Sequence, residues 1–283
     1  MTSSVSLPTE PPRDLRFRRR LRIGTSLVEL WRARELVRSM AEREMRARYK
    51  QTVLGFAWAV VIPVVYMVVF TVFFRRVANV NTRGVPYALF TYVGLLPWTF
   101  FSSSLSLGGT SLLTNLSILN KVYCPREIFP FASVSVAAID TTVATGVLGV
   151  LFAVTTFMPK ATIVWVPVLL AVQVAFTLGV VLLFSSIIVY VRDLRHLLPI
   201  ALQLGLFATP VAYGLEAIPS RWQWLYALLN PLGPVIDGYR RTVLFGQAPD
   251  MLLLGLSALT ATVLLVAGYA AFKRLETGIA DVA

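Results

Sequence analysis

Aromatic side chains recur in two apolar stretches of the sequence, at spacings that keep them near one face of a helix. In residues 53–74 and 85–107 they are Phe56, Tyr66, Phe70, Phe74, Tyr87, Phe90, Trp98 and Phe101. Aromatic rings can stack on the apolar faces of sugars, and Tyr and Trp add a polar group. The pattern is therefore typical of either a path for an amphipathic polymer or the ordinary packing of apolar helices.

One carboxylate, Asp140, lies deep within another apolar stretch. A charged group at such a position is costly in a membrane and by default indicates a function, such as a substrate contact or a proton site. The alternative is a structural hydrogen bond to Gln173 or Gln203 on neighbouring stretches. Because a proton relay needs several carriers and only Asp140 lies this deep, we favour the structural tie.

The sequence offers few residues for catalysis or metal binding. It has one His (His196) and one Cys (Cys124), whereas a structural zinc site takes about four N or S ligands. The phosphate-binding motif G-x-x-x-x-G-K-[ST] is absent, as are G-x-S-x-G and H-E-x-x-H. We therefore predict no catalytic and no metal-binding residues, and expect energy for any transport to come from another protein.

The composition predicts an all-α integral membrane protein. Of 283 residues, 57% are hydrophobic and 14% charged, against roughly 45–50% and about 25% in soluble domains. Crossing a bilayer takes roughly 20 apolar residues of helix, and we predict a membrane domain over 51–272 with six spans. The fifth span is interrupted by Pro199 and Pro210. The predicted spans are 53–74, 85–107, 129–157, 163–190, 197–215 and 251–272.

The charges indicate how the chain is oriented. Half of the 26 Lys and Arg residues lie in residues 1–50, which places this segment in the cytoplasm. With an even number of spans, both termini are then cytoplasmic. We expect a disordered tail over 1–24, an amphipathic interface helix over 25–50 and a cytoplasmic tail over 273–283. The net charge of +12 alone would suggest nucleic acid, but acids alternate with the basic residues, so a membrane surface explains them better.

Five short motifs, taken in order, resemble those of type-2 ABC transporter permeases that export polysaccharides such as O-antigen or teichoic acid. The resemblance runs from about residue 25 to the C-terminus. Cys124 departs from it, because an aromatic residue is usual just before that proline. The motifs are Lys50–Trp58 (KQTVLGFAW), Gly94–Phe101 (GLLPWTFF), Asn120–Glu127 (NKVYCPRE), Arg192–Leu194 (RDL) and Asn230–Leu232 (NPL) with Arg240.

The resemblance implies a homodimer with two copies of a P-loop ATPase, which would bind ATP and magnesium. A short cytoplasmic coupling helix would contact the ATPase, and Arg192 and Asp193 would make a second contact. The residues of the coupling helix would be Leu116, Ser117, Ile118, Leu119, Asn120, Lys121, Val122 and Tyr123.

The resemblance also implies a path for the substrate. Segment 217–245 would form short gate helices at the outer mouth, and the aromatic rings above would line a channel for a polymer carried on polyprenyl diphosphate. Arg46 and Arg48 would attract the diphosphate, although positive charge at the inner surface explains them equally. The polymer could be O-antigen, teichoic acid or a cell-wall galactan, exported across the inner membrane of a bacterium.

Three alternatives stay open at this point. A type-2 permease could export drugs or lipids instead of a glycan. An ion-driven flippase for lipid-linked glycans would need ionisable residues in several spans, and only Asp140 is present. A membrane-embedded glycosyl- or acyltransferase would need clustered His and Asp residues, which the sequence lacks.

Overall fold

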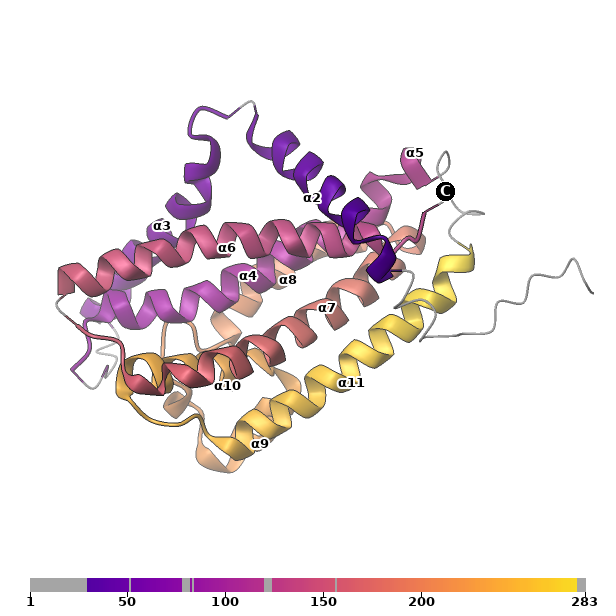
Figure 1. Cartoon of the computed structure of the whole chain (residues 1–283). Coiled ribbons are helices and arrows are strands. Elements are labelled where there is room, and N and C mark those ends of the chain that lie inside the picture. Colours follow the sequence, from indigo (N-terminus) through magenta and orange to yellow (C-terminus); the bar gives the residue numbers. More distant parts are fainter. Residues whose placement is uncertain are drawn as a thin grey trace, which may run out of the picture.

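The computed structural model describes residues 30–50, 52–77, 82, 84–119, 124–155 and 157–278, and these form a helical bundle. The long helices α4 (Tyr87–Thr114), α6 (Ile128–Thr155), α7 (Val166–Tyr190) and α11 (Met251–Leu275) run side by side (Figure 1). Helix α3 (Trp58–Val77) leans against α4, and its first turn continues from the short 3-10 turn Gly55–Ala57.

Five segments of the described chain are long and apolar enough to cross a membrane. They are Gly55–Phe73, Tyr87–Thr114, Ile128–Thr155, Ala161–Tyr190 and Met251–Leu275. The all-α membrane fold is confirmed, and four of the six predicted spans are reproduced within a few residues. The share of residues that are buried differs sharply between these segments. In the most apolar part of α4 78% of the residues are buried, whereas in that of the segment containing α3 only 11% are. Helix α4 is therefore the centre of the bundle, and α3 lies at its margin.

The helix in the predicted fifth span is shorter than expected. In the described residues, five segments rather than the predicted six are therefore long enough to cross a membrane. Helix α8 (Leu194–Ala208) has 15 residues and reaches only about 22 Å at 1.5 Å per residue. Thr209, the residue after α8, is extended (φ −92°, ψ 139°) because Pro210 disfavours the helical conformation of the residue before it. The chain then turns and continues into the 3-10 turn Leu215–Ala217.

Two short helices follow α8 at the end of the bundle opposite α5 (Leu116–Leu119), as Figure 1 shows. They are α9 (Ser220–Leu229) and α10 (Leu232–Arg240), and a π turn over Arg241–Phe245 follows them. Helix α11 then begins at Met251, and the carboxylate of the preceding Asp250 accepts hydrogen bonds from the backbone N–H groups of Leu252 and Leu253. Side-chain capping of this kind satisfies amides that have no partner within the helix.

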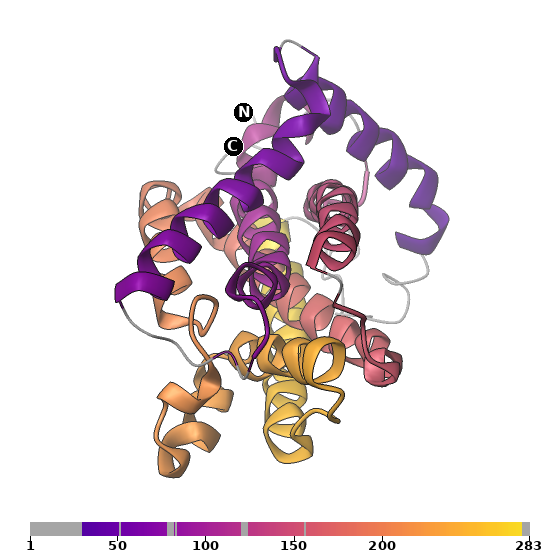
Figure 2. The same ribbon diagram turned by 90° about the vertical axis from the view of Figure 1, so that its left-hand side faces the viewer.

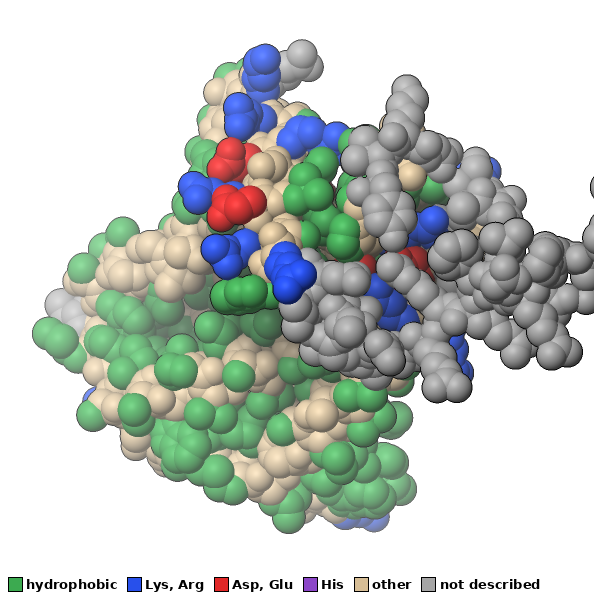
Figure 3. Space-filling model, turned by 45° about the vertical axis from the view of Figure 1, so that its right-hand side comes forward, with side chains coloured by type: hydrophobic (Ala, Val, Ile, Leu, Met, Phe, Trp, Pro, Cys, Tyr) green, Lys and Arg blue, Asp and Glu red, His purple; other side chains and the backbone are tan. Residues whose placement is uncertain are grey.

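Helix α2 (Arg34–Tyr49) precedes the bundle and packs on α6. Ala41 is buried there against Ala132 and Val136. Figure 2 shows α2 and α3 meeting at an angle, with α6 seen nearly end-on beneath them. Most charged side chains visible in Figure 3 gather over α2, whereas the bundle below is largely hydrophobic. The predicted helix over 25–50 agrees with α2 in its second half, and residues 1–29 lie outside the described residues.

Candidate functional site

A groove of about 660 Å³ lies between α3, α4, α6 and α8. Its walls combine aromatic rings, hydroxyl groups and one ion pair, and ionisable side chains are rare inside a membrane bundle. The polar and aromatic residues that line it are Arg48, Trp58, Tyr66, Phe70, Trp98, Thr99, Ser102, Ser103, Ser106, Asp140, Thr141, Gln203 and Phe207.

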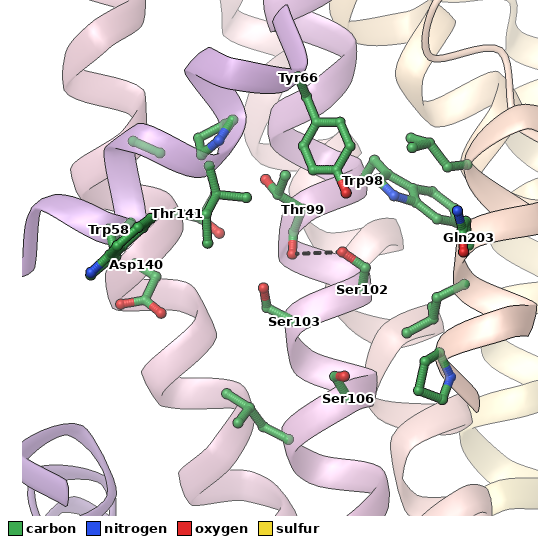
Figure 4. Close-up of a pocket in the computed structure, with 18 of the residues that line it drawn as sticks. Trp58, Tyr66, Trp98, Thr99, Ser102, Ser103, Ser106, Asp140, Thr141 and Gln203 are labelled. Atoms are coloured by element: carbon green, nitrogen blue, oxygen red, sulfur yellow. Dashed lines mark hydrogen bonds between the residues drawn. The ribbon is translucent and has the colours of Figure 1, made fainter. Parts of the chain in front are cut away.

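A stripe of hydroxyl groups on α4 forms one wall of the groove (Figure 4). Ser102, Ser103 and Ser106 follow Thr99 by three, four and seven positions, and these spacings place all four side chains on one face of the helix. Thr99 donates to the Leu96 carbonyl (2.9 Å), a backbone bond that leaves the lone pairs of the hydroxyl oxygen free to accept. The helical spacing of these hydroxyl residues is visible in the sequence, but the prediction of a channel rested on the aromatic residues of this segment alone.

Three of the predicted channel rings reach the groove. Tyr66 is 43% exposed, and Phe70 meets Phe207 of α8 edge-on at 6.3 Å between ring centroids. Trp98 borders the groove although it is only 6% exposed. Trp58, which was not among the predicted rings, stands beside Asp140 in Figure 4. The groove therefore presents aromatic surface mainly from α3.

The other predicted rings lie elsewhere. The hydroxyl of Tyr87 donates to the Ala212 carbonyl (2.6 Å), and Phe101 stacks on Phe176 at 5.3 Å. Phe90 is buried. Phe56 packs on Tyr49 at 4.9 Å. The side chain of Phe74 lies outside the described residues.

Arg48 and Asp140 form an ion pair that borders the groove. Arg48 Nη1 lies 2.8 Å from one carboxylate oxygen of Asp140, and the Tyr49 hydroxyl donates to the other oxygen, also at 2.8 Å. Burial, followed by this bond to Asp140, raises the pKa of Tyr49 to about 12, so its hydroxyl remains a donor at neutral pH. We expected a hydrogen bond between Asp140 and a glutamine, but its partners are Arg48 and Tyr49. Gln173 instead donates to the Pro97 carbonyl (3.1 Å).

The neighbouring Arg46 is placed differently from Arg48. It lies on the exposed side of α2 and pairs with Glu42 one turn earlier, at 3.2 Å. It does not border the groove. The two arginines that the sequence analysis grouped together thus have separate surroundings.

The predicted coupling segment is described in part. Leu116, Ser117, Ile118 and Leu119 form α5, and three of them pack against the buried cluster around Leu112, Phe129 and Phe272. Residues 120–123, which include Lys121 and Tyr123, lie outside the described residues. Cys124 packs on the same cluster, and burial raises the pKa of its thiol.

Arg192 and Asp193 lie at the exposed turn between α7 and α8, where the Asp193 carbonyl accepts from the His196 amide at 3.0 Å. Near this turn the ends of α7 and α11 are joined, because the Tyr190 hydroxyl donates to the Leu275 carbonyl at 2.6 Å. The turn that holds Arg192 and Asp193 therefore lies at the same end of the bundle as α5, the described part of the other predicted contact segment (Figure 1).

A buried charge cluster at this same end connects the start of α6 to the end of α11. Lys273 contacts the fully buried Glu127 and lies 2.9 Å from Glu276. Arg126 donates to the backbone carbonyl of Glu276, and the Tyr269 hydroxyl is 3.4 Å from Glu127. The two halves of this cluster are far apart in the chain, so no local spacing in the sequence predicts it.

Comparison with known families explains this architecture. The model of the ABC-2 type transporter family matches residues 35–244, which runs from α2 through the π turn after α10. The chain belongs to this ABC-2 family. It is accordingly a multi-pass membrane protein of a transporter family.

Curated relatives of this ABC-2 protein match along nearly their whole length. The O-antigen export system permease protein RfbA of Myxococcus xanthus is 32% identical over 254 residues, covering 89% of this chain and 97% of the relative. The protein of the same name from Klebsiella pneumoniae is 27% identical, with 88% and 95% covered. The polysialic acid transport protein KpsM of Escherichia coli is 24% identical, with 85% and 93% covered.

Proposed function

We propose that this chain is the membrane-spanning permease subunit of an ABC exporter for polysaccharide. The substrate is a polymer carried on polyprenyl diphosphate, such as O-antigen, teichoic acid or a cell-wall galactan, and it crosses the inner membrane of a bacterium. The names of the relatives support a polysaccharide. The observation that carries the proposal is the groove, because rings and hydroxyls together suit the apolar faces and hydroxyl edges of sugars.

The exporter is assembled from two copies of this chain and two copies of a P-loop ATPase. The ATPase binds ATP and magnesium and hydrolyses the nucleotide, because the chain itself has no phosphate-binding motif. Its docking surface is the segment Leu116–Tyr123 together with Arg192 and Asp193, and both termini are cytoplasmic. The charge cluster around Lys273 supports this arrangement, since it links the start of α6, which follows that segment in the chain, to the end of α11.

Blocking the groove tests the proposed path. Replacing Ser103 and Ser106 together with Leu adds apolar bulk along the α4 wall, and export of surface polysaccharide is expected to fall at least about tenfold. The matched control is Thr262→Leu, which makes a similar change on an exposed face of α11. Equal export by both variants, at equal amounts in the membrane, would show that the substrate takes another path.

A second experiment tests the partners. A tagged full-length chain is purified from its native membranes in mild detergent, and the proteins that accompany it are identified and counted. One ATPase per permease is expected. Lys121→Ala and Tyr123→Ala should weaken ATPase stimulation and export while leaving membrane insertion intact. Recovery of the chain without an ATPase, under conditions that preserve other ABC complexes, would favour an ion-driven flippase.

A further inference from the structure

The Arg48–Asp140 pair lies unusually deep for two charged residues. Asp140 is the thirteenth residue of α6, so it lies about 18 Å along that helix. An ion pair at such a position is expensive to desolvate and contributes little net stability compared with apolar packing. The helices α2 and α6 already have such packing through Ala41. Stability therefore gives no strong reason for this pair.

The two partners are unequally exposed. Only 11% of the Asp140 side chain is accessible, whereas 35% of the Arg48 side chain is, and both residues border the groove. Within the described part of the chain, the guanidinium makes one hydrogen bond, from Nη1 to Asp140. A guanidinium carries five N–H donors. Arg48 therefore has unused donors beside the groove while its charge is held by Asp140.

Asp140 has a second partner that would remain if Arg48 moved. The Tyr49 hydroxyl donates to the other carboxylate oxygen, and the pKa of Tyr49 keeps that proton in place. Loss of Arg48 would thus leave Asp140 hydrogen-bonded, although unpaired in charge. The contact between Arg48 and Asp140 can therefore break while the hydrogen bond from Tyr49 to Asp140 stays in place.

We propose that Arg48 and Asp140 form an exchangeable anion site, in which phosphate oxygens of the lipid-linked substrate replace the Asp140 carboxylate on Arg48. The inference rests on the proposed function, since the groove must carry that substrate. A phosphate group offers several acceptor oxygens and matches the planar guanidinium better than one carboxylate oxygen does. Asp140 then competes with the ligand, so the resting pair excludes weaker anions from the groove.

The competition makes a distinctive prediction, because the two halves of the pair act in opposite directions. Removing the cation removes the anion's partner, and removing the carboxylate removes its competitor. A purely structural ion pair behaves otherwise, since loss of either half leaves the same gap between α2 and α6. Whether replacing Asp140 tightens or weakens anion binding therefore decides between an exchangeable anion site and a purely structural ion pair.

The test measures binding of radiolabelled undecaprenyl diphosphate to the full-length chain in lipid nanodiscs. Arg48→Gln should weaken binding about tenfold, the effect of losing a charge-assisted hydrogen bond. Asp140→Asn keeps the shape and the acceptor for Tyr49, and should tighten binding about threefold. Arg48→Lys keeps the charge without the planar fork and should fall between wild type and Arg48→Gln.

The control pair lies on the same helix. Arg38→Gln and Glu42→Gln remove the two halves of an exposed ion pair that does not border the groove, and both should leave binding within about twofold of wild type. Weaker binding by Asp140→Asn, or equal effects at Arg38 and Arg48, would overturn the anion site. All variants are first compared by yield and elution volume, and only well-assembled chains are scored.

Competitors distinguish the possible sources of the phosphate. Inorganic pyrophosphate should displace the probe at high concentration, which would show that the phosphate oxygens are recognised. Phosphatidylglycerol should not displace it, and displacement by this lipid at equal concentration would overturn the assignment to the substrate. Polysaccharide export by wild type is measured separately. If wild type exports but Arg48→Gln and Asp140→Asn do not change binding in opposite directions, the anion site alone is overturned. If wild type exports no polysaccharide, the proposed function is overturned.

Discussion

Gly179 of α7 and Gly268 of α11 face each other where the two helices cross. A Cβ atom added to Gly179 would lie 2.6 Å from backbone atoms of Leu264 and Leu265, and one added to Gly268 would overlap the Gly179 carbonyl. Small residues at such crossings allow the backbones of membrane helices to approach closely. We expect Gly268→Val to force α7 and α11 apart and to destabilise the protein by about 1–3 kcal/mol or more.

Gly255 provides the control for this prediction. It lies on the exposed face of the same helix, and nothing lies within 4 Å of an added Cβ atom. Gly255→Val should therefore leave the thermal unfolding temperature in detergent close to that of wild type. Equal losses from Gly255→Val and Gly268→Val would mean that the Gly179–Gly268 crossing does not limit the packing.

Arg240 fixes the turn that follows α8. Its guanidinium donates to the carbonyls of Phe90 (3.2 Å), Pro210 (2.7 Å), Tyr213 (2.8 Å) and Val211. It also lies 3.8 Å from the ring centre of Phe90. Because buried carbonyls without donors cost about 1–3 kcal/mol each, Arg240→Met should lower the free energy of unfolding by at least about 3 kcal/mol.

The adjacent Arg241 separates this effect from a general loss of charge. Arg241 donates to the Ala248 carbonyl and lies 4.0 Å from Asp237, and its side chain is partly exposed, so Arg241→Met should cost less than about 1 kcal/mol. Arg240→Lys should not rescue Arg240→Met, because one ammonium group cannot serve carbonyls arranged around a planar fork. Chemical unfolding of the purified variants measures all three, and full rescue by Lys would contradict the role given to the guanidinium.

Local patterns made most of the fold predictable. Long uncharged runs marked α4, α7 and α11, and the basic segment marked α2. Helix α8 was predicted too long because the uncharged run continues past Pro210, whereas the backbone leaves the helix at Thr209. Composition reports the environment of a segment, but the helix end is set by backbone sterics at a single residue.

The site was predictable only in part, because its polar contacts join distant residues. Arg48 and Asp140 are 92 positions apart, and no spacing rule connects them. The aromatic faces of two segments were recognised, yet α4 turns the rings of Tyr87 and Phe101 into the bundle and its hydroxyl stripe toward the groove. A helix buried on nearly every side has two meaningful faces, and the aromatic pattern alone does not indicate which one meets a substrate.

Tyr66 and Trp98 should separate a substrate role from a packing role. Trp98 is buried against Phe101 at 5.7 Å, so Trp98→Ala should destabilise the protein by about 3–5 kcal/mol and reduce export through poor assembly. Tyr66 is half exposed to the groove, so Tyr66→Ala should reduce export severalfold with little change in unfolding temperature. Export per assembled permease is the measure, and a wild-type value for Tyr66→Ala would show that its ring only packs.

Glu44 should make the stability of the protein depend on pH. Its carboxylate oxygens lie 3.0 and 3.1 Å from the Ser133 hydroxyl. Burial raises the pKa of Glu44, while the bond from Ser133 and the charges of Arg43 and Arg48 act in the opposite direction. Because the folded state then holds the proton more tightly than the unfolded chain, stability falls as the pH rises from the ordinary glutamate pKa, about 4.3, through the raised value.

Glu44→Gln removes this ionisation and keeps an acceptor for Ser133. We therefore expect the variant to be more stable than wild type at pH 7, with the difference shrinking toward pH 4, when unfolding temperatures are measured in detergent across this range. Glu42→Gln is the comparison, since it removes an exposed carboxylate from the same helix. A Glu44→Gln variant that loses stability at pH 7 would mean that the attraction of Arg43 and Arg48 outweighs the burial of the charge.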